Sequence, residues 1–143
     1  MRSFTASRSP CPIGRASRIL GDRWALLILR EAFLGVDRFD DFLERLPISR
    51  AVLTARLRML VDTQVLSRDP PSGKRATYKL TEAGNDLFPM LTALRQWGDR
   101  WLFEPGHRPL PIHTRFGEDV APIEVRTTGG TPVVAADRVL WDS

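Results

Sequence analysis

Residues 39–62 read FDDFLERLPISRAVLTARLRMLVD and contain the strongest indication of the fold. The first half of this stretch places apolar residues at the spacing i, i+3, i+4 and i+7, which is the stripe of a short amphipathic helix: Phe39, Phe42, Leu43 and Leu46. Pro47 ends that helix, and Ser49 is well placed to cap a second helix that runs to about Asp62. The connection between them is only two or three residues long. A short helix, a tight turn and a second helix predict a helix-turn-helix.

The second helix of this pair has two different sides when its residues are placed on a helical wheel. One side is apolar and must face the core: Leu53, Leu57, Leu60 and Val61. The opposite side, which follows the cap Ser49, presents arginine and threonine among small residues: Arg50, Ala51, Thr54, Ala55 and Arg58. Arginine pairs bidentately with guanine in the major groove of DNA, and small side chains allow the helix to approach thymine methyl groups. We therefore expect Ser49 and this side of the helix to bind DNA, and Arg56, at the edge of the apolar side, to contact a phosphate or form an ion pair.

Two further helices are predicted before this pair. Residues 13–20 have helical character and stop at Gly21, after which Asp22 can cap a helix over residues 23–34. That helix is apolar on nearly all sides, so we expect it to be the central core helix. Gly35 ends it, and Asp37 can cap the helix that begins near Phe39.

A basic hairpin is predicted after the pair. Residues 65–68 and 77–80 are short strand candidates, and the segment between them contains two prolines, a glycine and a serine. Lys74 and Arg75 lie at the expected tip of this wing and Arg68 near its base. We expect these three residues to contact phosphates or the minor groove, which positions a protein on DNA without specifying sequence.

A long final helix is expected over residues 82–103, capped by Thr81. Large apolar residues recur in it at alternating spacings of three and four, the pattern of a helix-against-helix seam: Leu87, Met90, Leu94, Trp97 and Trp101. This seam is a candidate homodimer interface, and packing within one chain is the alternative. Pro89 lies inside the pattern and should kink the helix or mark a break after its first turns.

The predicted fold is mainly α (α+β), a winged helix-turn-helix with a long carboxy-terminal dimerisation helix and a small β-hairpin appendage. Residues 1–10 form a flexible arm, residues 11–103 the DNA-binding and dimerisation domain, and residues 104–111 a linker rich in proline. Residues 112–143 form the appendage, in which two short apolar runs flank Gly129 and Gly130.

Composition and charge restrict the function classes. The chain has 143 residues, of which 43% are hydrophobic and 27% charged, which is ordinary for a folded domain. Residues 1–80 hold 15 Lys and Arg against 8 Asp and Glu, whereas residues 81–143 hold 6 against 9, so a polyanion would dock on the first part. No apolar run is long enough to span a membrane, and no secretory signal is expected. The single cysteine, Cys11, suits a reducing cytoplasm.

The order and spacing of several short motifs resemble the HxlR family of bacterial winged-helix regulators. The matching pieces, in chain order, are Cys11-Pro12, Gly21-Asp22-Arg23-Trp24, Leu27-Ile28-Leu29-Arg30, Arg38-Phe39, Ile48-Ser49, Leu53-Thr54-Ala55-Arg56-Leu57 and Tyr78-Lys79-Leu80-Thr81-Glu82-Ala83-Gly84. The resemblance covers residues 11 to about 103. It implies a transcriptional regulator, expected to be a repressor, that binds a pseudo-palindromic operator as a homodimer with the Ser49 helix of each subunit in a major groove. Responsiveness to an oxidant, an electrophile or another small-molecule effector is also implied.

Cys11 is the candidate redox sensor. It precedes Pro12 at a helix start with Arg8 and Arg15 nearby, and both the helix terminus and positive charge favour a thiolate. Some members of the resembling family sense oxidants through a cysteine at the matching position. An inert, partly buried cysteine is the alternative.

The appendage is expected to lack metal and the chain to need no cofactor. Some longer relatives in the resembling family end in a zinc-ribbon-like appendage, and residues 116–117 and 126–130 resemble its outline without the sulfur ligands. Only His113 remains as a ligand there, and one cysteine and two histidines do not make a zinc site without unusual help from carboxylates.

Two other function classes compete with DNA binding. Catalysis would need a nucleophile with a base or paired carboxylates in a cleft, and both histidines lie in or beside the linker, far in sequence from Cys11, so we do not expect an enzyme. A winged helix can also act as a protein-interaction module without sequence-specific DNA binding. The uneven charge of the chain disfavours that alternative.

Overall fold

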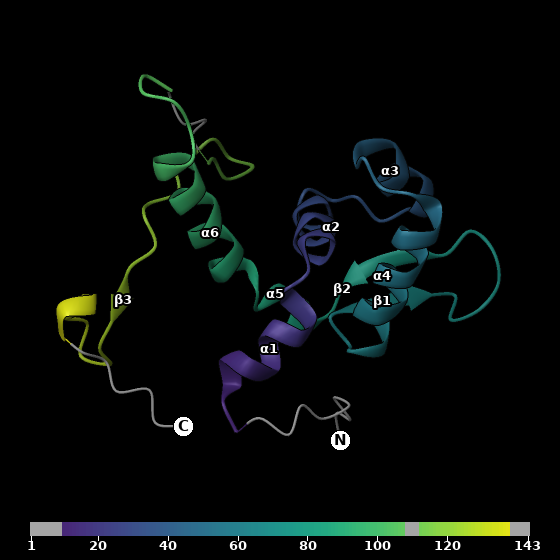
Figure 1. The fold of residues 1–143 in the computed structure, drawn as a ribbon, viewed down its shortest axis with the longest axis horizontal. Helices are drawn as coiled ribbons and strands as arrows, with labels where there is room; N and C mark the ends of the chain where they lie inside the picture. Colours follow the sequence, from purple (N-terminus) through teal and green to yellow (C-terminus); the bar gives the residue numbers. More distant parts are fainter. Residues whose placement is uncertain (1–9, 108–111, 138–143) are drawn as a thin grey trace. The chain divides into compact units, whose positions relative to one another are not determined.

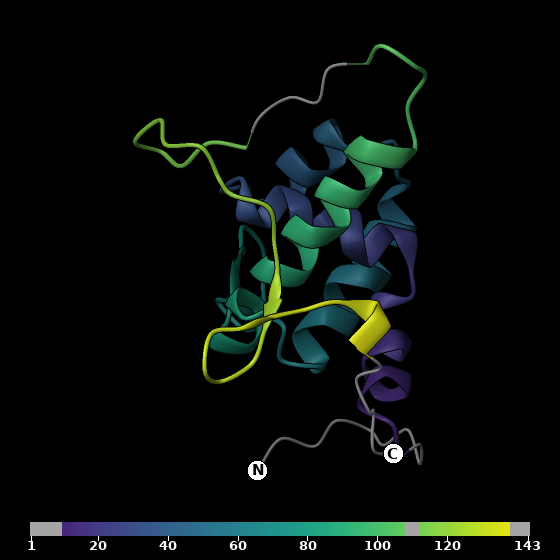
Figure 2. The same cartoon turned by 90° about the vertical axis from the view of Figure 1, so that its left-hand side faces the viewer.

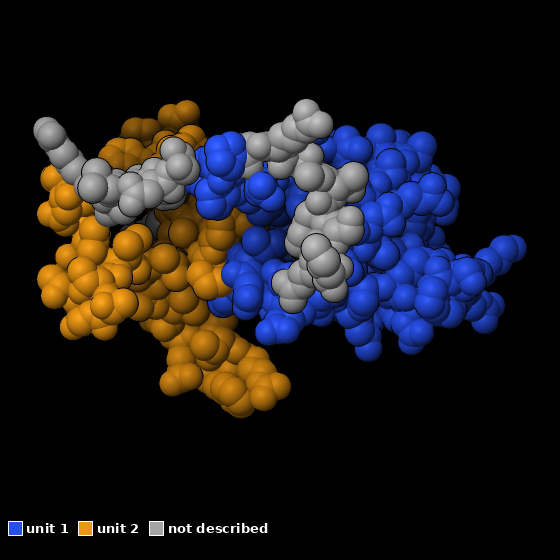
Figure 3. All heavy atoms as spheres, turned by 90° about the horizontal axis from the view of Figure 1, so that it is seen from below, with its two compact units in different colours: residues 1–88, 143 blue, residues 89–142 orange. Residues whose placement is uncertain are grey.

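The computed structural model describes residues 10–107 and 112–137 (Figure 1). These residues form two compact units, one of residues 10–88 and one of residues 89–107 and 112–137, which are coloured separately in Figure 3. Most of the predicted arm, part of the predicted linker and the end of the appendage lie outside the described residues. The expected domain boundaries at residues 103 and 112 stay predictions. Among the described helices, none has the length and apolar character needed to cross a membrane.

Helices α1 (Pro12–Leu20) and α2 (Arg23–Phe33) meet at a tight corner. A side chain at Gly21 would come within 2.4 Å of the Ser17 carbonyl oxygen, so only glycine fits this corner. Asp22 caps α2 as predicted, because its carboxylate accepts a hydrogen bond of 2.7 Å from the backbone N–H of Trp24. Ala25, Ile28 and Leu29 are fully buried, which confirms α2 as the core helix of this unit.

Helices α3 (Phe39–Arg45) and α4 (Arg50–Asp62) form the predicted helix-turn-helix. The turn is closed by a hydrogen bond of 2.8 Å from the Ile48 N–H to the Leu46 carbonyl. Ser49 caps α4 by accepting from the N–H of Val52 at 3.2 Å, which confirms the sequence assignment. The apolar side of α4 is buried as expected at Leu53, Leu57 and Leu60, and Val61 is half-buried.

The predicted cap of α3 is wrong. Arg38, not Asp37, occupies the N-cap position, and no side chain caps the helix. The reason is a tertiary pairing: the Asp37 carbonyl accepts a hydrogen bond of 2.8 Å from the Tyr78 N–H, and Arg38 forms a β-bridge with Thr77. The segment before α3 is therefore held against residues 77–80 by a single isolated β-bridge.

The wing consists of β1 (Leu66–Asp69) and β2 (Thr77–Leu80), which pair antiparallel with Arg68 opposite Tyr78. The first strand begins one residue later than predicted, and the second has the predicted bounds. The loop between them projects from the sheet at the right of Figure 1.

The predicted long helix is interrupted. A four-residue helix, α5 (Glu82–Asn85), is capped by Thr81, whose hydroxyl oxygen accepts from the Gly84 N–H at 3.1 Å. After a turn, α6 runs over Phe88–Trp101. Pro89 lies in the first turn of α6, where the missing N–H costs no helical hydrogen bond. The predicted break at this proline is confirmed.

The segment after α6 is mostly extended chain, with one helical turn near its end (Figure 2). It contains the predicted hairpin as two short paired strands, β3 (Val125–Arg126) and β4 (Pro132–Val133), followed by the turn η1 (Ala135–Asp137). The Thr127 N–H donates to the Thr131 carbonyl at 2.9 Å, which closes the hairpin around Gly130.

A buried carboxylate joins α2 to α3. Glu31 is 2% exposed, and its carboxylate accepts hydrogen bonds from the guanidinium groups of Arg30 and Arg45. Burial raises the pKa of Glu31, but the hydrogen bonds and positive charges of Arg45 and Arg30 outweigh it, so the pKa lies below its ordinary value. A carboxyl whose pKa is lowered in the folded protein stabilises it at neutral pH and loses that effect in acid.

We predict that Glu31→Gln lowers the free energy of unfolding at pH 7 by about 1–3 kcal/mol, because two arginines lose their anionic partner. The difference from the unchanged protein should be complete at neutral pH and should narrow as the pH falls below about 4.5, where the unfolded-state carboxyl begins to protonate. Urea unfolding at pH 7 and pH 3.5 measures both effects. Glu44→Gln, an exposed change on α3, is the matched control. A pH-independent difference would show that the charge of Glu31 is not what stabilises the fold.

Candidate nucleic-acid interface

The outer face of α4 is open to solvent. Every residue that the sequence assigned to this face is exposed: Ser49, Arg50, Ala51, Thr54, Ala55 and Arg58. The Thr54 hydroxyl donates to the Arg50 carbonyl at 2.8 Å, so its donor is used within the helix and its methyl group and oxygen lone pairs remain available. The face thus combines small side chains with cations, which is the chemistry that a major groove accommodates.

The two arginines on this face differ in their freedom. The guanidinium of Arg50 lies 5.2 Å from the centre of the Phe39 ring and 3.8 Å from a carboxylate oxygen of Asp40. Arg58 makes no hydrogen bond or ion pair within the described part of the chain. Arg58 can therefore turn toward a ligand without breaking a contact, whereas Arg50 is loosely held against the start of α3.

Arg56 forms the ion pair that was one of its two expected roles. Its Nε lies against Oδ2 of Asp22, and both side chains are largely covered, with 35% and 26% exposed. The geometry is that of a close charge contact and does not meet the angles of a hydrogen bond. Because Asp22 also caps α2, one carboxylate links the start of the core helix to the middle of α4. A phosphate contact by Arg56 stays a prediction.

The wing loop is held by two arginines. Arg68 donates from Nη1 to the Pro70 carbonyl and from Nη2 to the Gly73 carbonyl, each at 2.6 Å. Arg38 donates from Nη1 to the Arg75 carbonyl at 3.3 Å. The seven-residue loop 70–76, with two prolines and a glycine, has few backbone hydrogen bonds of its own, so these donors give it a defined shape.

This arrangement changes what each basic residue of the wing can do. The guanidinium of Arg68 donates to loop carbonyls, so Arg68 positions the wing loop. Its phosphate contact stays a prediction. Lys74 and Arg75 are exposed at the tip, where the sequence placed them. Sequence reasoning missed Arg38, because its partner lies 37 residues away in the chain.

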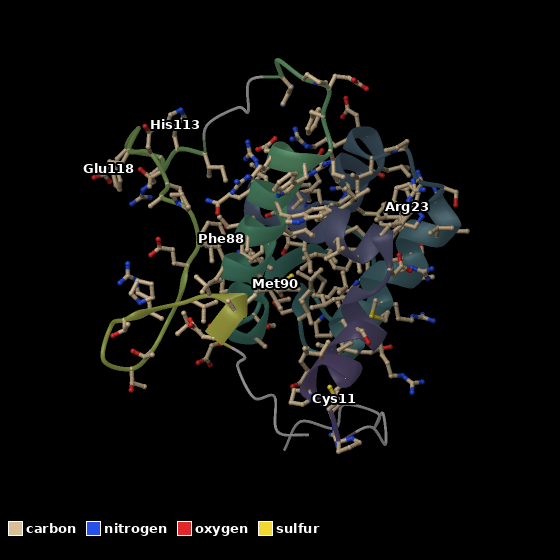
Figure 4. The ribbon with its side chains drawn as sticks, turned by 60° about the vertical axis from the view of Figure 1, so that its left-hand side comes forward. Cys11, Arg23, Phe88, Met90, His113 and Glu118 are labelled. Carbon is tan, nitrogen blue, oxygen red and sulfur yellow. The ribbon has the colours of Figure 1, made fainter. Side chains whose placement is uncertain are left out.

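The predicted seam is largely exposed on α6. Met90, Leu94, Trp97 and Trp101 are exposed, with 54% for Trp97 and 62% for Trp101, whereas Leu87 is half-buried in the turn before the helix. Figure 4 labels Met90 near the start of α6. Contiguous apolar side chains exposed on one helix usually mark an interaction surface. Each of these four residues is more than a third exposed, and both a role in a dimer and packing within one chain stay predictions.

Cys11 and His113, the candidate redox residue and the remaining metal-ligand type of the appendage, belong to segments other than α4 and the wing loop. Cys11 is half-buried at the N-cap position of α1, where Figure 4 labels it. His113 pairs through Nδ1 with Asp119 at 2.7 Å, within the loop that Figure 4 shows after α6. The described residues contain no group of three or more His, Cys, Asp or Glu that could hold a metal ion. Redox sensing by Cys11 stays a prediction.

We predict that Asp22 and Arg56 are energetically coupled. Asp22→Asn keeps an oxygen that can cap α2 but removes the charge, and Arg56→Met keeps the packing of the stem but removes the guanidinium. A double-mutant cycle from urea unfolding should give a coupling of about 0.5–1 kcal/mol, since both groups are partly solvated. Additive effects would show that the pair does not hold α4 in place.

Comparison with known proteins supports the winged helix-turn-helix fold. The model of a family described as HxlR-like helix-turn-helix matches residues 19–105. The chain is 44% identical over 126 residues to Rv3095 of Mycobacterium tuberculosis, an HTH-type transcriptional regulator, with 86% of this chain and 80% of the relative covered.

Two solved structures are also similar. The crystal structure of PA1607, described as a putative transcription factor, matches with a TM-score of 0.85 and 39% identity over 94% of this chain and 97% of its own. PA1374 from Pseudomonas aeruginosa, with the same description, matches with a TM-score of 0.63 and 32% identity over 91% of this chain and 90% of its own. Both matches extend beyond the helix-turn-helix to the segment after α6.

Proposed function

The chain belongs to the HxlR-like helix-turn-helix family of transcriptional regulators, and from this premise we propose that it binds a pseudo-palindromic DNA operator as a homodimer and represses transcription. The observation that carries the proposal is the exposed face of α4, which sets Arg50 and Arg58 among small residues while Leu53 and Leu57 anchor the opposite face.

In the proposed complex α4 lies in the major groove. Arg58, which has no partner among the described residues, pairs with the acceptors of a guanine. Ala51, Thr54 and Ala55 let the helix approach closely, and the methyl group of Thr54 can contact thymine. Arg50 leaves its loose contact with Asp40 for a base or a phosphate, and Ser49 presents the amino end of the helix to the backbone.

The wing adds affinity without sequence information. Lys74 and Arg75 contact phosphates or the adjacent minor groove from the loop tip, while Arg38 and Arg68 keep the loop in the shape that displays them. Phosphate contacts release counterions from DNA, so the affinity should fall steeply with salt.

The exposed seam of α6 supports the homodimer. A twofold dimer buries the same residues of both copies, here Met90, Leu94, Trp97 and Trp101. Two copies of α4 related by that axis would bind half-sites separated by about one turn of DNA or a multiple of it. A dimer that covers promoter DNA excludes the polymerase, which is why we propose repression.

The α4 assignment is tested with the operator selected from genomic DNA by the purified protein. We predict that Arg58→Ala weakens operator binding by about 1–3 kcal/mol and relaxes preference at one base pair of each half-site. Lys74→Ala should weaken binding to all sequences similarly and reduce the slope of log affinity against log salt by about one per subunit. Fluorescence anisotropy between 50 and 200 mM salt measures both quantities.

Arg115→Ala is the matched control for these variants, because Arg115 is an exposed arginine outside α4 and the wing. It should leave operator affinity and the salt slope unchanged. If Arg58→Ala weakens operator and random DNA equally, α4 does not determine specificity. If affinity does not change with salt, the chain is an interaction module of another kind.

The dimer is tested separately from DNA. Leu94→Asp places a carboxylate from each subunit in the proposed seam and should weaken dimerisation by about 100-fold or more, because both charges would be desolvated. Sedimentation velocity over a range of concentrations measures the shift. Phe116→Asp is the control, since Phe116 is 75% exposed but lies outside α6. A Leu94→Asp protein that remains a dimer, or unchanged protein that is monomeric, would exclude this seam.

A further inference from the structure

A cavity of about 520 Å³, open to solvent, lies within the carboxy-terminal unit, between α6 and the segment of residues 112–123. Figure 2 shows the last part of this segment passing beside α6, and the hydrogen bonds of Gln96 to Ala121 and Ile123 confirm that the two are adjacent. The volume falls in the range of small-molecule sites. None of the residues that we assign to DNA binding lines it.

The wall of the cavity opposite α6 is held by one side chain. The Gln96 amide donates from Nε2 to the Ala121 carbonyl at 3.0 Å and accepts at Oε1 from the Ile123 N–H at 2.8 Å. These are the two hydrogen bonds that a neighbouring strand would make. The Val120 N–H donates to the Ile112 carbonyl at 2.8 Å and closes the same stretch into a loop. The cavity is therefore built by specific polar bonds, with Ile112 and Ile123 facing it as apolar lining.

The groups that remain available inside the cavity define a ligand class. Trp97 and Trp101 provide flat apolar surface, since more than half of each side chain is exposed. Arg100 also lines the cavity, with its guanidinium 5.0 Å from the centre of the Trp101 ring and no hydrogen bond or ion pair within the described residues. The other charged lining residue, Asp99, has its carboxylate 3.7 Å from Nε of Arg95. One uncompensated cation beside two indoles favours an anion with a flat aromatic body.

We propose that this cavity binds a small aromatic carboxylate, with its ring against Trp97 and Trp101 and its carboxylate on Arg100, and that the ligand regulates operator binding. The regulatory half rests on the proposed DNA-binding function, whereas the binding half does not.

The position of the cavity on α6 gives the link to regulation. At 100° per residue, Ala93, Gln96 and Arg100 lie on one face of α6, and Met90 and Leu94 of the proposed seam lie on the next face. Trp97 lies on the border between the two faces, and Trp101 lies within the seam face between Met90 and Leu94, yet both also line the cavity. A ligand that orders these two indoles changes the surface that the second copy must cover. A ligand shifts an equilibrium between two states only if it binds the two states with different affinity. Here that difference in affinity would arise at the two indoles, which belong to both the cavity and the seam.

The binding half is tested by calorimetric titration of the full chain with 2-naphthoate and with 2-naphthalenemethanol, a neutral molecule with the same ring system. We expect saturable binding of naphthoate at one site per chain, at least tenfold tighter than the alcohol. Arg100→Gln should abolish this preference without weakening the alcohol, and Trp101→Leu should weaken both probes. Arg115→Gln is the matched control, since Arg115 also stacks on an aromatic ring, that of Phe116, at 4.7 Å but does not line the cavity.

Absence of saturable naphthoate binding, or naphthoate binding that Arg100→Gln leaves intact, would overturn the site. The alcohol shows whether an Arg100→Gln protein still forms the cavity, so loss of folding is not mistaken for loss of the cation.

The regulatory half is measured as operator affinity with and without saturating naphthoate. We expect at least a threefold change in the unchanged protein and none in Arg100→Gln. Naphthoate binding with unaltered operator affinity would overturn the effector role. A chain that binds naphthoate but no DNA at all would instead contradict the proposed function and leave the aromatic carboxylate site standing.

Discussion

Burial of one face of α4 is the constraint on which the rest of the molecule depends. Leu53, Leu57 and Leu60 are almost completely buried, and removing such side chains from water contributes several kcal/mol. Their spacing leaves only one orientation of the helix in which all three are covered. The same orientation exposes Arg50, Thr54 and Arg58 together. The chemistry of the outer face is therefore a consequence of the packing of the inner face.

Polar side chains then fix the segments that apolar packing alone would leave loose. Asp22 joins the start of α2 to α4, and Glu31 joins α2 to α3 through Arg45. Arg68 shapes the wing loop, and Gln96 holds the extended chain after α6. Asp22 and Glu31 each contact a side chain on another helix. Arg68 and Gln96 each form hydrogen bonds with backbone groups that have no strand partner. Such contacts contribute modestly to stability, but they define positions, which is what a surface that must match DNA or a ligand requires.

The parts of the structure that were predicted from the sequence are those set by local chemistry. Caps at Asp22 and Ser49, the two faces of α4, the strand Thr77–Leu80 and the break at Pro89 all follow from residues within one turn or strand of the feature. The assignment that was wrong, Asp37 as the cap of α3, failed because the backbone there pairs with Tyr78, 41 residues along the chain. The contacts of Arg38 and Gln96 were not predicted for the same reason, because their partners are brought close only by the tertiary fold.

In the proposed complex the outer face of α4 lies in the major groove of the operator, a position that site-specific photo-cross-linking can detect. A benzophenone amino acid at Ala55, on the exposed face, should cross-link to bases within each half-site, at positions mapped by primer extension. The same group at Met59, which is half-buried, should give no cross-link to bases. Cross-links from Met59 but not from Ala55, or none from either while the protein is bound to the operator, would show that the outer face of α4 does not lie in the major groove.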